Sequence, residues 1–556
     1  MPTGTGLRFS DRPAIEAIIA KTKPTHHGLR SLVEEVVASE LFQTKEIIAT
    51  MKSHFFTSLL ACLVSPLLST LVAAPGDVPA PAAAVTPAEW LRAQPKPKFR
   101  AGHTLPRLTR FAWDMDDDVR VALAEDWGYA LEFGVADPDR VDRAINDPKS
   151  REGKLLALAI SDPKRYPLYI TTSRELPKAP VREVWTRDAQ GKFVAENESS
   201  LEDTTWNPEM KTVLSPMAPD SFWQEAGELS AAPIRKLRAK CPIAIVLNTG
   251  EYGLGVAGFW KPVWIKDPTI MKAKGDKPWL EFTSERKAHG QAIITKAERD
   301  AAPDRQLYIY YTCGGGTHRS INVDDVWSYS WAAFKDISDL PSNESYFSHI
   351  NSGWTGPQDM LTMVLNAASL EIAGGRPLSY NWLSAGWEGE KGHSHGDIAR
   401  WTGFLKCYYT AGMIGGNAGY YQYLGRDGFS KPFAPGQPPH WLRQITALAQ
   451  VHATFSHLED FLRNGDLLPG PDKHRLSKDS PAFEFPTGDK TARVLARKHR
   501  QRAEWLVTAW VADGDAREVT VTIPDLGEIK LQARPDGAVY LASLKDGQLA
   551  LTETDF

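Results

Sequence analysis

The chain has 556 residues, a formal net charge of −4 and a pI near 6.4. This length predicts two to four structural units, although a barrel can use 250 to 400 residues by itself. The balanced charge, without a run of like charges, disfavours a nucleic-acid-binding surface. The 18 tryptophans fit either a Trp-rich core or flat surfaces for stacking on sugar rings.

Residues 51–74 (MKSHFFTSLLACLVSPLLSTLVAA) have a basic start, an apolar stretch and small residues at the end. This pattern predicts a secretory signal peptide that is cleaved near Ala73 or Ala74. A transmembrane anchor is the alternative, which Pro66 and the Ala-rich segment after it disfavour. We therefore expect a secreted or periplasmic protein with no membrane association after signal cleavage.

Residues 1–50 precede this predicted signal peptide. Because a signal peptide opens a chain, we expect Met51 to be the true start and residues 1–50 to be a mis-called or fused extension. A genuine pair of N-terminal helices is the alternative. The stretch LRSLVEEVVASELFQTK resembles the tail of a domain found in planctomycete-type multidomain proteins. Residues 75–100, rich in Ala and Pro, predict a linker.

Residues 101–475 alternate short β-rich runs with helical or irregular stretches, which favours βα units and a parallel sheet. The β-rich runs are 108–114, 129–133, 168–172, 243–247, 306–311, 346–350, 378–383 and 413–421. Helical periodicity covers 233–240, 360–372, 397–411 and 439–462. Eight strands with intervening helices predict an α/β fold, a (β/α)₈ TIM barrel with long βα loops. A doubly wound open sheet is the alternative, although no glycine-rich phosphate loop supports a nucleotide-binding version.

Residues 485–556 contain short alternating strands separated by turn residues. This pattern predicts a small all-β antiparallel sandwich domain. Its sequence resembles the C-terminal sandwich that often follows a glycosidase barrel.

Two glutamates follow predicted strands at the place where a barrel carries its chemistry. Glu251 follows the fourth run in NTGEYG, and Glu388 follows the seventh in SAGWEGE. Glycosidic cleavage requires one protonated and one ionised carboxyl group. The sequence therefore predicts a glycoside hydrolase. Glu390 competes with Glu388, and an inverting enzyme would use Glu251 with Asp114 or Glu390.

Glutamates after strands four and seven resemble the catalytic pair of the retaining glycosidases of clan GH-A. The resemblance covers residues 105–465 and implies that Glu251 is the acid/base and Glu388 the nucleophile. In that clan an Asn directly precedes the acid/base, whereas Asn248 stands three residues before Glu251, which leaves the role of Asn248 open.

Aromatic and hydrogen-bonding residues near the predicted strand ends suit a sugar-binding site. These candidates are Trp113, Arg174, Asn248, Tyr311, His318, His349, Asn351, Trp354, Trp382, Trp387, His393 and Asn417. Arg174 either keeps the nucleophile ionised or pairs with Glu132 or Glu175. Of Tyr310 and Tyr311, strand alternation lets only one face inward.

We expect no metal and no cofactor, because His393 and His395 have no evident third ligand nearby. The expected partner is a poly- or oligosaccharide, with an algal polysaccharide preferred, and His318 with Arg319 suits an anionic group such as a sulfate. A non-catalytic glycan-binding barrel protein is the competing hypothesis. The sequence gives no oligomeric state.

Overall fold

The computed structural model describes residues 21, 83–111, 115–134, 138–172, 184–194, 206–207, 212–249, 257–311, 331–342, 344–346, 378–384, 397–418, 429–472, 482–554 and 556. The chain forms two compact units, Met1–Ala82 and Ala83–Phe556. The first unit, except Lys21, lies outside the described residues, and so do the predicted extension and signal peptide.

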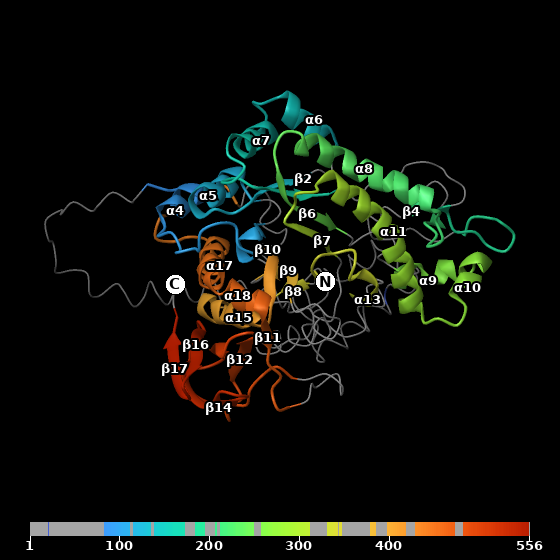
Figure 1. Cartoon of the computed structure of the whole chain (residues 1–556). Coiled ribbons are helices and arrows are strands. Elements are labelled where there is room, and N and C mark those ends of the chain that lie inside the picture. The colour runs from blue at the N-terminus through green and yellow to red at the C-terminus, as the bar shows by residue number, and fades with distance from the viewer. Residues whose placement is uncertain are drawn as a thin grey trace. The chain divides into compact units, whose positions relative to one another are not determined.

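Eight strands of the second unit form two four-stranded parallel sheets (Figure 1). The first sheet has the order β2 (Leu131–Gly134), β3 (Leu168–Thr171), β6 (Ile243–Thr249) and β7 (Leu307–Tyr311). The second sheet has the order β1 (Arg110–Phe111), β10 (Met413–Ala418), β9 (Ser379–Ser384) and β8 (Glu344–Tyr346). The predicted parallel arrangement is confirmed within each sheet.

Each of these strands overlaps one of the predicted runs. The largest difference is at β8, which spans Glu344–Tyr346 whereas the predicted run is 346–350. Residues 347–350 lie outside the described part of the chain.

Helices connect the strands, and several of them begin after a Ser, Thr or Asp whose side chain caps the first turn. The helices are α4 (Pro87–Ala93), α5 (Asp117–Trp127), α6 (Pro138–Asn146), α7 (Arg151–Ser161), α8 (Asp220–Arg238), α9 (Ala257–Trp264), α10 (Pro268–Lys274), α11 (Trp279–Ala301), α13 (Trp331–Phe334), α15 (Ile398–Thr410), α17 (His440–His457) and α18 (Glu459–Asn464). A 3₁₀ turn, Pro106–Leu108, precedes β1. The side chains of Ser150 and Asp397 accept backbone N–H groups at the starts of α7 and α15.

The segment predicted as a linker contains helix α4. Thr86 and Glu89 form a reciprocal capping box at its start, and Pro87 occupies its first turn. Leu91 is fully buried in the core, so the helix is anchored rather than free. The described residues 83–100 are therefore part of the folded unit, in contrast to the linker predicted from their Ala and Pro content.

Helix α8 is longer than predicted, because it begins at Asp220 and keeps Pro233 inside. It runs beside α11 away from the strands, towards α9, α10 and the short strands β4 (Trp206–Asn207) and β5 (Thr212–Val213) (Figure 1). We call these elements, with the adjoining parts of α8 and α11, the arm. The arm has its own apolar cluster, which includes Val213, Phe222, Trp264 and Phe282.

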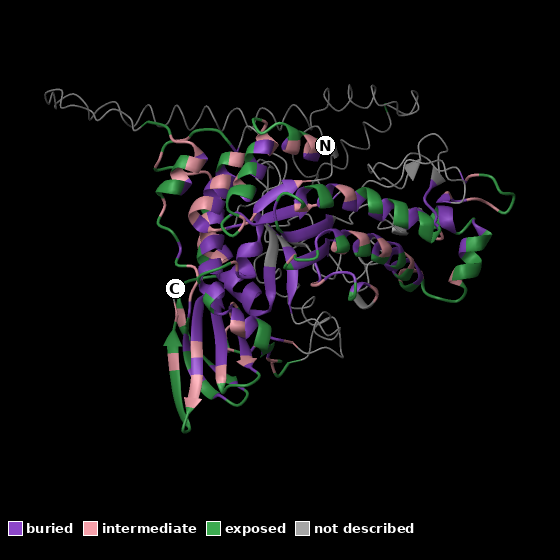
Figure 2. Cartoon of the chain, turned by 45° about the horizontal axis from the view of Figure 1, so that its top comes forward, coloured by how far each residue is buried: buried purple, intermediate pink, exposed green. Residues whose placement is uncertain are grey.

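Side chains of the first sheet alternate between two apolar layers. An inner core contains residues of both sheets, among them Tyr169 and Ile309 of the first sheet and Tyr380 and Met413 of the second. An outer layer lies between the first sheet and helices α6, α7, α8 and α11. The described residues of the first sheet are accordingly mostly buried on both faces, whereas α8 and α11 keep exposed stripes (Figure 2). None of the helices in the described ranges is long and apolar enough to cross a membrane.

The two seams between the sheets are bridged by hydrogen bonds and an ion pair. At one seam, Arg110 of β1 pairs with Glu132 of β2 at 3.1 Å. At the other, the N–H of Asp339 donates to the carbonyl of Tyr308 in β7 at 2.9 Å. Two residues later, the carbonyl of Pro341 accepts from the N–H of Tyr380 in β9 at 2.8 Å. The segment that leads into β8 therefore contacts the edge strand of the first sheet.

The C-terminal region forms two antiparallel sheets, as predicted. One has the order β11 (Gly465–Leu467), β12 (Ala492–His499), β13 (Glu504–Val511), β16 (Ala538–Lys545) and β17 (Gln548–Glu553). The other pairs β14 (Arg517–Ile523) with β15 (Gly527–Ala533). Both sheets contribute to one hydrophobic cluster. Because β11 belongs to the first of them, this region recruits residues from before the predicted boundary at 485.

Helix α15 joins the parallel sheets to the C-terminal sheets through buried contacts. Thr410 and Thr508 share a hydroxyl–hydroxyl hydrogen bond of 2.6 Å. The Trp510 ring lies against Gly403, where an added Cβ would stand 2.1 Å from ring atom Cδ1. The fully buried guanidinium of Arg497 donates to four backbone carbonyls, including those of Thr410 and Leu462. The two regions therefore share a tightly packed interface.

Candidate functional site

The predicted site lies where the eight parallel strands end. Every one of these strands leads, at or just after its last residue, into a segment outside the described residues. Glu251 follows the last residue of β6 by two positions, and Glu388 follows the last residue of β9 by four. Most predicted site residues lie in these segments, namely Trp113, Asp114, Arg174, Glu251, His318, His349, Asn351, Trp354, Trp387, Glu388, Glu390 and His393. Their roles stay predictions.

Tyr311 ends β7 and its side chain belongs to the inner core. Its neighbour Tyr310 faces the outer layer, where its ring stacks on Phe334 at a centroid distance of 5.2 Å. Between the two tyrosines, Tyr311 is thus the one on the inner face of the strand. It is 2% exposed and stands at the end of the strand.

Trp382 and Asn417 lie at one level of the second sheet. Asn417 of β10 is in register with Trp382 of β9 on one side and with Arg110 of β1 on the other. Two predicted sugar-binding positions are therefore neighbours across the sheet, next to an arginine that the sequence analysis did not select.

Arg110 belongs to a buried ionic cluster at the seam between β1 and β2. Glu132 lies 3.1 Å from Arg110 and 3.2 Å from Arg120 of α5. Burial raises the pKa of the Glu132 carboxyl, but the positive charges of Arg110, Arg120 and Arg140 outweigh it and hold the pKa below its ordinary value. Glu132 is therefore an ionised partner of arginines and is unsuited to donate a proton at neutral pH.

Two tyrosine hydroxyls lie in the inner core beside this cluster. The Tyr380 hydroxyl donates to the carbonyl of Leu108 at 2.6 Å and lies 3.3 Å from the Tyr169 hydroxyl. Burial raises the pKa of both phenols, and in Tyr169 the charge of Arg110 opposes that rise. The hydrogen bond between β3 and β9 ties the two sheets together across the core.

Asn248 lies one position before the end of β6, and its amide is engaged on the helix-facing side. Its Nδ2 donates to both carboxylate oxygens of Glu298 in α11, at 2.9 and 3.1 Å. Glu298 also accepts from the hydroxyls of Ser230 in α8 and Tyr308 in β7. The structure therefore gives Asn248 an internal partner, which accounts for its burial without a substrate.

Glu298 has no exposed surface. Burial raises the pKa of its carboxyl, and hydrogen bonds from Ser230, Tyr308, Asn248 and Thr172 oppose the rise. Thr172 directly follows β3 and Asn248 lies near the end of β6, so one carboxyl fixes the ends of two adjacent strands.

Sequence reasoning missed Glu298 because a glutamate inside a long helix is usually exposed. The only available signal was position: Glu298 lies on the face of α11 that also carries Ile294 and Ala301, three or four residues away. Arg110 and Arg120 were missed for the same reason, since charged residues are seldom buried unless paired.

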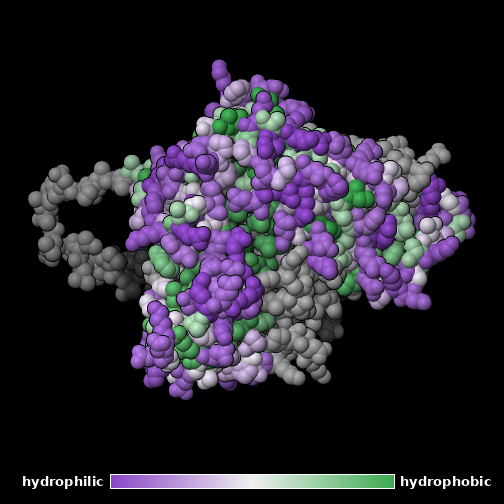
Figure 3. All heavy atoms as spheres, viewed as in Figure 1, coloured by the Kyte–Doolittle hydropathy of each residue, from purple (hydrophilic) through white to green (hydrophobic). Residues whose placement is uncertain are grey.

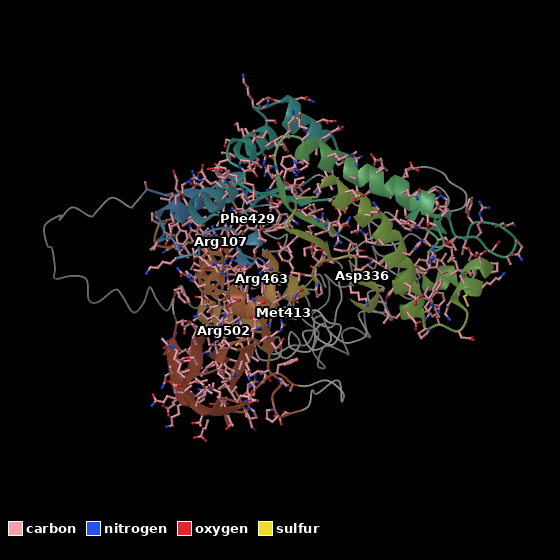
Figure 4. The ribbon with its side chains drawn as sticks, in the orientation of Figure 1. Arg107, Asp336, Met413, Phe429, Arg463 and Arg502 are labelled. Carbon is pink, nitrogen blue, oxygen red and sulfur yellow. The ribbon has the colours of Figure 1, made fainter. Side chains whose placement is uncertain are left out.

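A pocket of about 590 Å³ lies at the opposite ends of the strands. Its lining includes Pro167, Pro242 and Gln306, which precede β3, β6 and β7, and the buried side chain of Arg107 (Figure 4). It is therefore remote from the predicted site. Within the described ranges, no three His, Cys, Asp or Glu side chains gather into a group that could hold a metal ion.

Comparison with known proteins gave structural likenesses only. No family model and no curated protein matches the chain. The glycoside hydrolase domain of PgaB (BpsB) from Bordetella bronchiseptica is similar at 16% identity and a TM-score of 0.30, over 52% of this chain and 76% of that one.

A cold-adapted β-galactosidase from Rahnella sp. R3 matches at 8% identity and a TM-score of 0.41, over 76% of this chain and 98% of that one. A trehalulose synthase variant matches at 11% identity and a TM-score of 0.44, over 78% of this chain and 99% of that one. These values are too low to assign this chain a fold or an activity.

Proposed function

We propose that the two parallel sheets are the halves of one (β/α)₈ barrel. Their strands follow the chain order of such a barrel, and both sheets fill a single inner core. The contacts at the two seams support closure, since Arg110 reaches Glu132 at one and the segment before β8 reaches β7 at the other. The C-terminal sheets, which share a core, are proposed as the β-sandwich domain.

We infer further that the protein is a secreted glycoside hydrolase that acts on a poly- or oligosaccharide with retention of configuration. The observation that carries this proposal is the position of two carboxylates in a counted series of parallel strands. Glu251 comes two residues after the fourth strand, β6, and Glu388 four residues after the seventh, β9. In a closed barrel both would stand at the same rim.

In the proposed mechanism, Glu388 attacks the anomeric carbon while Glu251 protonates the departing glycosidic oxygen. The covalent glycosyl-enzyme is then hydrolysed by a water molecule that Glu251 deprotonates. Tyr311, Trp382 and Asn417 lie at or near the ends of their strands, and this position supports a role in binding the sugar. The predicted export signal supports action outside the cytoplasm.

The first prediction concerns the two glutamates. Glu251→Gln and Glu388→Gln should each lower kcat by 10³-fold or more, because each removes one of two groups that the reaction requires; the size follows from about 4 kcal/mol of transition-state stabilisation. The measurement is reducing-sugar release across a panel of plant and algal polysaccharides. Glu281→Gln, an exposed glutamate of α11, is the control.

Two further measurements refine the assignment. Glu390→Gln tests the competing nucleophile. Loss of turnover in that variant but not in Glu388→Gln would identify Glu390, and not Glu388, as the nucleophile. The anomeric configuration of the first product, followed by NMR, separates retention from inversion. Near-normal turnover in both Glu251→Gln and Glu388→Gln would refute the glycosidase mechanism.

A further inference from the structure

The tip of the arm carries a concentration of lysines that the proposed catalytic chemistry does not use. Residues 257–279 contain five lysines and two aspartates, in a chain whose net charge is −4. We call the five, Lys261, Lys266, Lys272, Lys274 and Lys277, the lysine surface. Lys274 is half-buried and the other four are exposed.

The aspartates do little to neutralise this surface. Asp267 is buried, and its carboxylate accepts the backbone N–H groups of Arg187, Thr269 and Ile270. The Asp267 carboxylate is therefore occupied by backbone donors inside the fold. Asp276 is the exposed acid of residues 257–279.

One of the lysines has an acidic partner. Lys277 pairs with Glu285 of α11 at 2.5 Å. For the other four, no ion pair is found with any residue in the part of the chain that the structure describes. Unpaired like charges repel one another, so this surface is more favourable with an anion bound than without one.

Trp279 holds two of the unpaired ammonium groups near one ring. The Nζ atoms of Lys261 in α9 and Lys274 in α10 lie 5.8 and 5.4 Å from the indole centroid. The ring in turn meets the buried ring of Phe282 edge to face at 6.1 Å. These cation–π contacts position charges from two helices before any ligand arrives, which lowers the entropy cost of binding.

Two exposed apolar side chains lie next to the charges in sequence. Ile265 precedes Lys266 and is 49% exposed, and Met271 precedes Lys272 and is 37% exposed. In Figure 3 the lobe that contains α9 and α10 is mainly hydrophilic with small apolar areas. A ligand here meets cations interspersed with apolar contacts, which suits a charged sugar better than a bare inorganic ion.

The lysine surface is also close along the chain to the predicted acid/base. Helix α9 begins at Ala257, six residues after Glu251. Six residues span at most about 22 Å even when fully extended. A polymer bound at the proposed catalytic rim therefore has the start of α9 within the length of a few sugar units.

We propose that the lysine surface binds an anionic polysaccharide that carries carboxylate or sulfate groups, and that such a polymer is the substrate. The claim that the surface binds such a polymer is argued from the charges described above. The claim that the polymer is the substrate rests on the proposed glycosidase function. Charge complementarity selects a polyanion, and the predicted acid/base Glu251, six residues before α9, selects a polysaccharide among polyanions.

The test is binding of the full chain to polygalacturonate, to carrageenan and to neutral laminarin, measured by isothermal titration calorimetry. Polygalacturonate carries carboxylates and carrageenan carries sulfates, so the pair identifies the recognised group. We expect at least one acidic polymer to bind at least tenfold more tightly than laminarin, with an affinity that falls as NaCl is raised. Measurements on Glu251→Gln exclude turnover during the titration.

Variants locate the binding surface. Lys266→Ala and Lys272→Ala should each weaken binding about fivefold, and Lys266→Glu combined with Lys272→Glu should abolish it. Lys296→Ala and Lys530→Ala are matched controls, because both side chains are exposed and are already paired with acids. Circular dichroism of each variant verifies folding.

Three results would overturn the proposal: equal binding of laminarin, unchanged binding in the double charge reversal, or equally tight binding of DNA or of anionic phosphatidylserine vesicles. The two proposals fail separately. Lysine-dependent binding without loss of turnover in Glu251→Gln and Glu388→Gln would refute the glycosidase mechanism alone. Loss of turnover in those variants with lysine-independent binding would refute the lysine surface alone.

Discussion

At the scale of single residues, the carboxyl of Glu298 is held by hydrogen bonds from three different elements, α8, β6 and β7. Its carboxyl is fully buried, and its hydrogen-bond donors are neutral groups of Asn248, Ser230, Tyr308 and Thr172. A buried carboxyl without a cation is costly unless its oxygens are satisfied. Removal of this carboxyl would leave several buried donors without a partner, and each orphan carries its own desolvation cost.

We therefore expect Glu298→Ala to lower the free energy of unfolding by about 3 kcal/mol or more, and Glu298→Gln, which keeps the shape, to cost less. The measurement is urea unfolding followed by tryptophan fluorescence. Glu281→Ala, at an exposed position of the same helix, is the control and should change stability by no more than about 0.5 kcal/mol. Equal stability of Glu298→Ala and this control would contradict the structural role.

At the scale of elements, the arm depends on close contact between α8 and α11. Gly290 of α11 lies directly under the Trp223 ring of α8, where an added Cβ would stand 2.6 Å from the nearest ring atom. The ring has little room to move, because it is buried and its Nε1 donates to the carbonyl of Ala218. A helix interior otherwise disfavours glycine relative to alanine.

Gly290→Ala should consequently lower the free energy of unfolding, by about 1–3 kcal/mol, instead of raising it as helix propensity alone predicts. Ala292→Gly, at an exposed position of the same helix, measures the propensity term and should cost about 1 kcal/mol. Chemical denaturation of both variants gives the comparison. A stabilised Gly290→Ala would show that the two helices are farther apart than described.

At the scale of the whole molecule, one histidine couples the fold to pH. His452 of α17 lies between the hydroxyls of Tyr129 and Tyr409, at 2.7 and 2.5 Å. Burial, assisted by the charge of Arg107, lowers the pKa of His452 to about 3. Since its pKa in the unfolded chain is about 6.5, protonation favours the unfolded state.

The contribution of His452 to stability is complete above pH 6.5 and is lost as pH falls towards 3. The expected slope is up to about 1.4 kcal/mol per pH unit in that window. His452→Gln should reduce the slope of unfolding free energy against pH between 6.5 and 4, with His457→Gln of the same helix as the control. An unchanged slope would mean that His452 is hydrated or charged in the fold.

Sequence patterns predicted the order and the approximate place of all eight parallel strands, because each is a short β-rich run between turn or helical signals. They did not predict α4 or the arm. Helix α4 was assigned to a linker from its Ala and Pro content, although the capping pair Thr86 and Glu89 was visible in the sequence. The arm depends on contacts between segments far apart in the chain, such as Trp264 with Leu214, which local periodicity does not report.

For the candidate site, the sequence supplied residue types at strand ends but not their partners. Alternation allowed only one of Tyr310 and Tyr311 to face inward without saying which, and the structure places Tyr311 on the inner face. The sequence left the role of Asn248 open, and in the structure the amide of that residue donates to Glu298, 50 positions later. Long-range pairings of this kind are set by tertiary packing and leave no local signature.

The seating of Trp510 against Gly403 restricts how the two regions of this protein could evolve or be rebuilt. A flexibly tethered module can be exchanged or deleted without harm, but here a ring atom occupies the space that any larger residue at position 403 would need. Loss of the C-terminal sheets would also strip the carbonyls of α15 and α18 of the Arg497 guanidinium. Domain shuffling should therefore have carried both regions together as one inherited block.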